Sequence, residues 1–265
     1  MVENKKQMIS PKLSALIVVH NEDHQLQACL ETLDFADEIV VVLDRCSDDS
    51  KKIASRFTDK IIEGAWPLEG PRRHAGIDAC SGEWIFEVDA DERATTELGE
   101  EIIKVIAHAP PGYFLVPIDN YIGNRLVRHG WGGSWGVLAT PRLFTPGSKT
   151  WGNQRIHPSL TLVGPKRRLN KPLMHLVDKD LADMILRLQR YTDAKAADMA
   201  ETDRSKTFFL NVLRRSVSRF FKCWVMRQGW REGYWGFTIA LMAALYPLLS
   251  YLKYRLNSSS NSEEI

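Results

Sequence analysis

Three apolar runs rich in β-branched residues constrain the fold of this chain more than any other feature. They are LSALIVV at 13–19, EIVVVL at 38–43 and WIFEV at 84–88, with a shorter candidate strand at 60–63. Continuous apolar runs of this length are typical of strands buried on both faces in a parallel sheet. Stretches with helical spacing separate the runs. The resulting β-α-β order predicts an α/β fold built on a mostly parallel, doubly wound sheet.

Carboxylates follow two of these strands directly. Asp44 ends the second run, and Asp89 and Asp91 follow the run WIFEV in the sequence DADE. Ligands of such sheets bind at the carboxyl ends of the strands, so we expect these side chains to lie together at that edge of the sheet. Alternate carboxylates suit Mg²⁺ or Mn²⁺, which prefer oxygen ligands and bridge to phosphate oxygens. The alternatives are a solvated acidic turn at DADE and an ordinary capped turn at Asp44.

A basic pair, Arg72 and Arg73, follows the turn Leu68-Glu69-Gly70-Pro71. Guanidinium groups are suited to binding phosphate, so this pair is a candidate for contact with a diphosphate. The alternative is a solvated start of a helix.

The composition excludes some classes of protein. The chain has 265 residues, 44% of them hydrophobic, which is enough for a sizeable core. Its net charge of +2 argues against a nucleic-acid binder that depends on overall charge. The four cysteines form no CxxC pair and are expected to be free thiols. The N-terminus lacks the apolar stretch of a signal peptide, so a cytoplasmic catalytic domain is expected.

The pattern divides the chain into a flexible lead-in at 1–12, a catalytic domain at 13–205, a basic and aromatic helical segment at 206–256 and a disordered tail at 257–265. The helical segment fits a helix at an anionic membrane surface. It contains GYWGFTIALMAALYPLLSYL, which is close to the roughly 20 residues needed to span a bilayer. A buried helical hairpin and a true membrane span are the alternatives.

Four stretches, in this order and spacing, resemble glycosyltransferase family 2 with its GT-A nucleotide-sugar-binding fold. They are LSALIVVHNED, FADEIVVVLDRCSDDS, EGPRRHAGIDACSGEW and IFEVDADER. The likeness is strong over 13–100, looser to about 200, and nearest to the branch that adds sugars to the lipopolysaccharide core. It implies inverting, metal-dependent transfer of a hexose from a UDP-sugar, with UDP-glucose as the default donor. The implied acceptor is a lipid-linked glycan or lipopolysaccharide core at the cytoplasmic face of the inner membrane.

The resemblance also implies roles for individual residues. Contact with the nucleotide is implied for His20, Asn21, Glu22, Asp44, Arg72, Arg73 and Asp89. Binding of the Mg²⁺ or Mn²⁺ ion is implied for Asp91, Asp89 and His175. The chain departs from the family's pattern at His20, where tyrosine or threonine is common, and at Arg45-Cys46-Ser47, where glycine-serine-threonine is common.

The chain departs most from the family's pattern at the position expected to supply the general base. Related enzymes often have His-Glu where this chain has His157-Pro158. His157 is the first candidate, because imidazole titrates near neutral pH. Asp119 and Asp178 are its rivals.

Two other functions compete with glycosyl transfer. A nucleotidyltransferase would show a glycine-rich loop with a lysine after the first strand, whereas here HNEDHQ follows it. The second alternative is a degenerate transferase that is recruited to a membrane and has no activity. Such a protein needs no general base, so the absence of the His-Glu pair is compatible with it.

Overall fold

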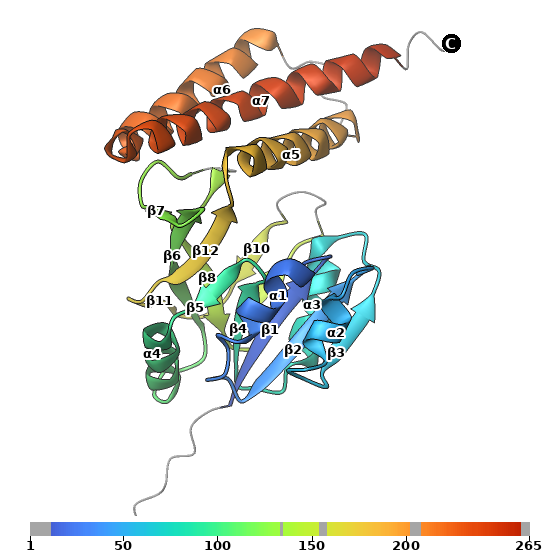
Figure 1. Cartoon of the computed structure of the whole chain (residues 1–265), viewed down its shortest axis with the longest axis vertical. Helices are drawn as coiled ribbons and strands as arrows, with labels where there is room; N and C mark the ends of the chain where they lie inside the picture. The colour runs from blue at the N-terminus through green and yellow to red at the C-terminus, as the bar shows by residue number, and fades with distance from the viewer. Residues whose placement is uncertain (1–11, 133–134, 154–157, 202–207, 261–265) are drawn as a thin grey trace, which may run out of the picture. The chain divides into compact units, whose positions relative to one another are not determined.

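The computed structural model describes residues 12–132, 135–153, 158–201 and 208–260 (Figure 1). His157 and most of the expected lead-in lie outside these ranges. The chain forms two compact units. The first comprises Met1–Pro117 and Ala139–Met174, and the second comprises Ile118–Leu138 and His175–Ile265.

The first unit contains the predicted parallel strands. β1 (Leu13–Val19) lies between β2 (Glu38–Asp44) and β4 (Trp84–Asp89), and β3 (Ile61–Gly64) pairs with the outer side of β2. All three pairings are parallel. The side chains of β1 are buried throughout, as the continuous apolar pattern predicts.

Helices connect these strands. α1 (Asp23–Leu30) and α2 (Ser50–Ala54) pack together, and α3 (Glu69–Ala79) packs against β1 and β2 (Figure 1). The chain moves outward from β1 to β3 and then returns to β4, so right-handed crossovers place α3 on the opposite face from α1 and α2. The doubly wound arrangement is therefore confirmed.

Beyond β4 the sheet becomes mixed. β8 (Ala139–Phe144) pairs antiparallel with β4, and β6 (Tyr113–Ile122) pairs antiparallel with β8. The parallel order predicted from the sequence therefore applies to the N-terminal half of the sheet. Between β4 and the long helices the chain also forms β5 (Glu92–Ala94), α4 (Thr96–Ile106), β7 (Arg125–Val127), β9 (Lys149–Trp151), β10 (Leu160–Leu162), β11 (Lys166–Arg168) and β12 (Leu173–Asp178).

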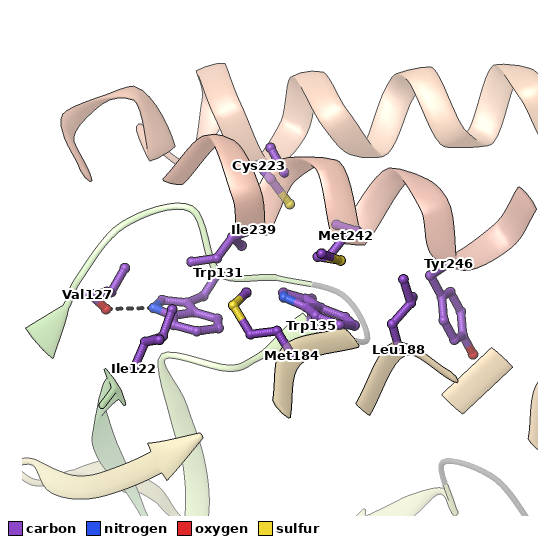
Figure 2. Close-up of a cluster of buried hydrophobic side chains, with 12 residues drawn as sticks. Ile122, Val127, Trp131, Trp135, Met184, Leu188, Cys223, Ile239, Met242 and Tyr246 are labelled. Carbon is purple, nitrogen blue, oxygen red and sulfur yellow. Dashed lines mark hydrogen bonds between the residues drawn. The ribbon is translucent and has the colours of Figure 1, made fainter. Parts of the chain in front are cut away.

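The second unit is mainly helical. Its long helices are α5 (Leu181–Glu201), α6 (Phe209–Phe221) and α7 (Tyr234–Ser260). A π-helical turn at Lys222–Met226 and a 3₁₀ turn at Gly229–Glu232 connect α6 to α7. The core contains two buried tryptophans, Trp131 and Trp135, which lie among side chains of α5 and α7 (Figure 2).

The grouping of elements differs from the expected domain boundary at 205. The segment 118–138 and α5 belong with the C-terminal helices, because their apolar side chains share one core with α7. α7 continues through Ser260, so residues 257–260 of the expected disordered tail are helical. The four cysteines are free thiols, as expected.

α7 is long and apolar enough to cross a membrane by length and composition alone. Its candidate span, Tyr234–Asn257, has 24 residues and a mean hydropathy of 1.5. However, 44% of its most apolar window is buried inside the protein, and core helices pass the same test. Ile239, Met242 and Tyr246 of this helix belong to the core of the second unit (Figure 2).

Candidate functional site

The two acidic positions meet at one edge of the sheet. Leu43, which precedes Asp44, pairs with Val19 of β1, and Asp89 pairs with the adjacent Val18. The ends of β2 and β4 therefore lie two strand spacings apart, or roughly 10 Å. This confirms the predicted convergence of carboxylates from distant parts of the chain.

Two consecutive arginines of α3 hold these carboxylates in place. Arg72 Nη1 donates to Asp44 Oδ2 at 3.1 Å. Arg73 Nη2 lies 3.0 Å from Asp89 Oδ1. Successive side chains of a helix point about 100° apart, so neighbouring arginines can reach different strands. The start of α3 thus braces both acidic positions.

Asp44 is enclosed by hydrogen-bond donors, and its side chain is only 1% exposed. Arg45 donates to it through Nε and Nη2, and the Trp66 N–H donates to Oδ1, each at 3.0 Å. Burial acts to raise the pKa of Asp44, but the bonds from Arg45 and Trp66 lower it below its usual value. Since the Arg45 side chain is 54% exposed, it is the partner of Asp44 that faces solvent.

The loops after β1 and β2 are joined by hydrogen bonds. His20 Nδ1 contacts the Asp44 carbonyl oxygen at 2.6 Å, and the Ser47 N–H donates to Asn21 Oδ1 at 2.8 Å. Glu22 lies beside them, its N–H donating to Ser50 Oγ at 3.2 Å. The three residues expected near a nucleotide base therefore adjoin Asp44. A cavity of about 260 Å³ opens here, lined by Leu43, Arg45, Cys46, Ser47, Asp48, Lys51, Glu63 and Gly64.

Asp89 and Arg73, which are expected to contact the nucleotide, also take part in an ion network in this structure. Arg73 is 7% exposed, and it contacts Glu69 and Glu87 as well as Asp89. Arg142 is the second cation on Asp89. Burial acts to raise the pKa of Asp89, but the charges of Arg142 and Arg73 hold it well below its usual range. The Asp89 side chain, which is 31% exposed, is therefore the counter-ion of two arginines in this structure.

Several members of this network were not anticipated. Lys149 Nζ donates to Glu87 Oε2 at 2.5 Å, and Arg142 Nη2 donates to Glu92 Oε1 at 2.6 Å. The sequence does carry a signal for them. Glu87 interrupts the run WIFEV, and a charge inside a strand buried on both faces requires buried partners.

Asp91 occupies the turn between β4 and β5 and is half-buried. Within the described ranges, no three or more histidine, cysteine, aspartate and glutamate side chains are grouped as metal ligands. With Asp89 occupied by two arginines, the edge offers a small set of protein ligands. Such a set fits Mg²⁺ or Mn²⁺ bound through one carboxylate, with phosphate oxygens and waters as the other ligands.

The remaining predicted residues that the structure describes lie in the second unit. His175 Nδ1 lies 2.9 Å from Asn120 Oδ1, and Asn120 Nδ2 donates to the Val137 carbonyl at 2.9 Å. The second bond fixes the amide orientation, so Nδ1 of His175 is the donor to Asn120 Oδ1. Asp119, on β6, is half-buried.

Asp178 is a structural residue rather than a candidate base. It is 3% exposed and accepts from Arg187 Nε at 2.9 Å and Nη2 at 2.7 Å. Burial raises its pKa, and the charge of Arg187 opposes that rise. The Arg187 guanidinium also lies 4.1 Å from the centroid of the Trp135 ring. The ion pair thus anchors α5 to the tryptophan core, and Asp178 has no access to an acceptor.

The sequence comparison decides the family. A profile described as Glycosyl transferase family 2 matches residues 14–156, which include β1 to β9 and the acidic edge. The chain belongs to glycosyl transferase family 2. This assignment favours transfer of a glycosyl group over transfer of a nucleotidyl group.

Full-length relatives support the same assignment. The lipopolysaccharide core biosynthesis glycosyltransferase LpsC of Rhizobium meliloti is 26% identical over 277 residues, covering 95% of this chain and 96% of its own. An uncharacterized glycosyltransferase of Rickettsia conorii, RC0292, is 22% identical and covers 97% of this chain and 94% of its own.

A solved structure shares the fold. The crystal structure of S. aureus TarS 1-349 aligns with a TM-score of 0.50 and 14% sequence identity. The alignment covers 96% of this chain and 92% of the TarS chain. The expected GT-A fold is confirmed at this level.

Proposed function

We propose that this family 2 glycosyltransferase transfers a hexose from a UDP-sugar to a lipid-linked or lipopolysaccharide core acceptor, with inversion at the anomeric carbon. The observation that carries the proposal is the acidic edge, where α3 braces the ends of β2 and β4 beside the loops of His20 and Arg45. The similarity to LpsC, which is named as a lipopolysaccharide core glycosyltransferase, supports the acceptor class.

The nucleotide would bind over the loops that follow β1 and β2. Asp44 can accept a hydrogen bond from the base or the ribose only if Arg45 releases it, because the carboxylate is otherwise saturated. Arg45 is exposed enough to move, and its guanidinium is suited to binding the diphosphate once released. Arg72 stays on Asp44 and keeps the loop in place.

Asp91 would hold the metal ion. Bound there, Mg²⁺ or Mn²⁺ supplies positive charge that stabilises the departing nucleoside diphosphate. The acceptor hydroxyl oxygen attacks the anomeric carbon, the bond to the diphosphate breaks, and a general base takes the hydroxyl proton. His157 remains the first candidate for that base, and Asp119 is the candidate within the described residues.

The acceptor class fits a membrane-facing surface on the second unit. Leu210, Leu213, Val217 and Phe221 share one face of α6 and are all exposed, while Val212 and Ser216 are buried. Arg214 is exposed beside this face, and Arg215 lies further around the helix. An exposed apolar stripe with basic neighbours is typical of a helix that lies at a membrane surface. We infer attachment through α6 at the cytoplasmic face of the inner membrane.

A panel of nucleotide sugars tests this proposal. Thermal unfolding of the full chain is measured with each sugar nucleotide, with and without Mn²⁺. A ligand at 100 times its Kd stabilises the folded state by about 2.7 kcal/mol, so the true donor should raise the Tm more than the others do. Release of UDP on addition of a lipopolysaccharide core acceptor would then separate catalysis from binding alone. A panel in which no UDP-sugar raises the Tm would contradict the proposal.

A further inference from the structure

A small basic cavity lies within the second unit, whereas the acidic edge belongs to the first. Its volume is about 110 Å³. It is lined by Lys195 and Met199 of α5, Val212, Arg215 and Arg219 of α6, and Tyr246, Pro247, Ser250 and Tyr251 of α7. One water occupies about 30 Å³ of the liquid, so the cavity has room for a few water-sized groups. That is enough for a phosphate group and too little for a sugar nucleotide.

The charges around this cavity are unbalanced. Three basic residues line it and no acidic residue does. Lys195 shares its charge with Asp198, 2.5 Å away. Over the described part of the chain, neither Arg215 nor Arg219 has an ion pair with a carboxylate. Two like charges four residues apart on one helix repel each other, and a bound anion would remove that repulsion.

The geometry of Arg219 favours a phosphate group. Its guanidinium carbon lies 5.1 Å from the centroid of the Tyr246 ring, which is within the range of a cation–π contact. This contact restrains the position of the guanidinium. Planar arginine donors of this kind bind phosphate oxygens in pairs.

The surroundings indicate a lipid as the source of the phosphate. The same helix that carries Arg215 and Arg219 exposes Leu213, Val217 and Phe221. Between residues 209 and 260 the chain has eight basic residues and one acidic residue. We propose that Arg215 and Arg219, assisted by Lys195, bind the phosphate of an anionic membrane phospholipid in this cavity. The site rests on the proposed attachment of α6 to a membrane and adds a specific headgroup contact to it.

Vesicle binding of the full chain tests the site. The pocket variant carries Arg215→Gln and Arg219→Gln, and the matched control carries Arg214→Gln and Arg231→Gln, which remove the same charge from exposed positions outside the cavity. Each basic residue near an anionic surface is worth about fivefold in affinity, so the control should bind phosphatidic acid vesicles about 25-fold more weakly than the wild type. The affinity of the pocket variant for these vesicles should be roughly tenfold lower than that of the control. Equal losses in the two variants would overturn the site.

Soluble ligands distinguish a lipid headgroup from free phosphate. Dihexanoyl phosphatidic acid should raise the Tm of the wild type and the control but not of the pocket variant, and inorganic phosphate at equal concentration should raise it less. An equal rise with inorganic phosphate would overturn the lipid assignment. If the wild type bound no anionic vesicle, the attachment itself would fall, whereas its UDP-sugar binding would be unchanged.

Discussion

Arg72 and Arg73 are neighbours in sequence with different surroundings in the structure. Arg73 is buried and contacts Glu69, Glu87 and Asp89, whereas the Arg72 side chain is 21% exposed and donates to Asp44. Removing a cation from a buried network leaves carboxylates without their counter-charge. Removing Arg72 should lower the free energy of unfolding by less, because Asp44 still accepts hydrogen bonds from Arg45 and Trp66.

The two arginines should therefore separate stability from binding. Arg73→Met should lower the free energy of unfolding by about 3–5 kcal/mol, and Arg72→Met by about 1–2 kcal/mol. Arg72→Met should instead weaken UDP binding, because the loop of Asp44 loses its brace. Urea denaturation and titration calorimetry of both variants measure these effects. Equal losses of stability would mean that the buried network does not depend on Arg73 as described.

Glu87 predicts how stability depends on pH. Burial acts to raise its pKa, but the charges of Lys149 and Arg73 lower it from 4.5 to about 2. A carboxyl with a lowered folded-state pKa stabilises the protein above its unfolded value, and that contribution is lost as the pH falls from 4.5 to 2. It amounts to about 3 kcal/mol.

Urea denaturation at a series of pH values between 5 and 2 checks this prediction. It measures the free energy of unfolding of the wild type and of Glu87→Gln. The wild type should lose stability steeply across this range, and the variant less steeply. Glu38→Gln should flatten the curve in the same way, since Lys60 and Ser14 also lower the pKa of Glu38 to about 2. Parallel curves for the wild type and Glu87→Gln would show that Glu87 is not the source of the effect.

At the scale of elements, α3 positions the candidate site. Gly76 allows the helix to lie close to the sheet, because a Cβ atom there would be 2.4 Å from Leu16 Cδ1 and 2.8 Å from Val42 Cγ2. Gly76→Ala should displace α3 and destabilise the protein by about 1–3 kcal/mol. Because α3 carries Arg72, UDP affinity should fall as well.

Asp78→Ala is the control for this change, since Asp78 is exposed on the same helix. It should alter neither the free energy of unfolding nor the UDP affinity beyond about 0.5 kcal/mol. A Gly76→Ala variant with wild-type UDP affinity would show that the site does not depend on the close packing of α3.

Sequence patterns predicted the elements that follow periodic rules. The apolar runs identified β1, β2 and β4, and the positions of Asp44 and Asp91 at the ends of strands followed from them. The pattern did not show which of the two consecutive arginines is buried, because both lie at the start of one helix. Nor did it show that 118–138 joins the C-terminal helices, because the contacts of Trp131 and Trp135 are remote in sequence.

At the scale of the whole molecule, charge is distributed unevenly. The chain carries a net charge of +2, yet residues 209–260 contain eight basic residues and one acidic residue. The rest of the chain therefore carries net negative charge. An anionic membrane should attract the helical segment and repel the remainder, which favours contact through α6.

This asymmetry predicts salt-sensitive binding. Raising the ionic strength from about 0.1 M to about 1 M shortens the Debye length from about 10 Å to about 3 Å. Affinity of the full chain for phosphatidylglycerol vesicles should fall by about tenfold or more. Sedimentation with vesicles measures it, with phosphatidylcholine vesicles as the uncharged control. Binding to both lipids that is unchanged by salt would point to apolar insertion alone.

The most direct test of the central claim concerns the carboxylate of Asp91. Titration calorimetry measures UDP binding to the full chain with and without Mn²⁺, for the wild type and for Asp91→Asn. We expect Mn²⁺ to strengthen UDP binding to the wild type by at least about tenfold and to have no effect on the variant, with both proteins equally stable. The same Mn²⁺ effect in both proteins would contradict a metal site at the edge formed by β2 and β4.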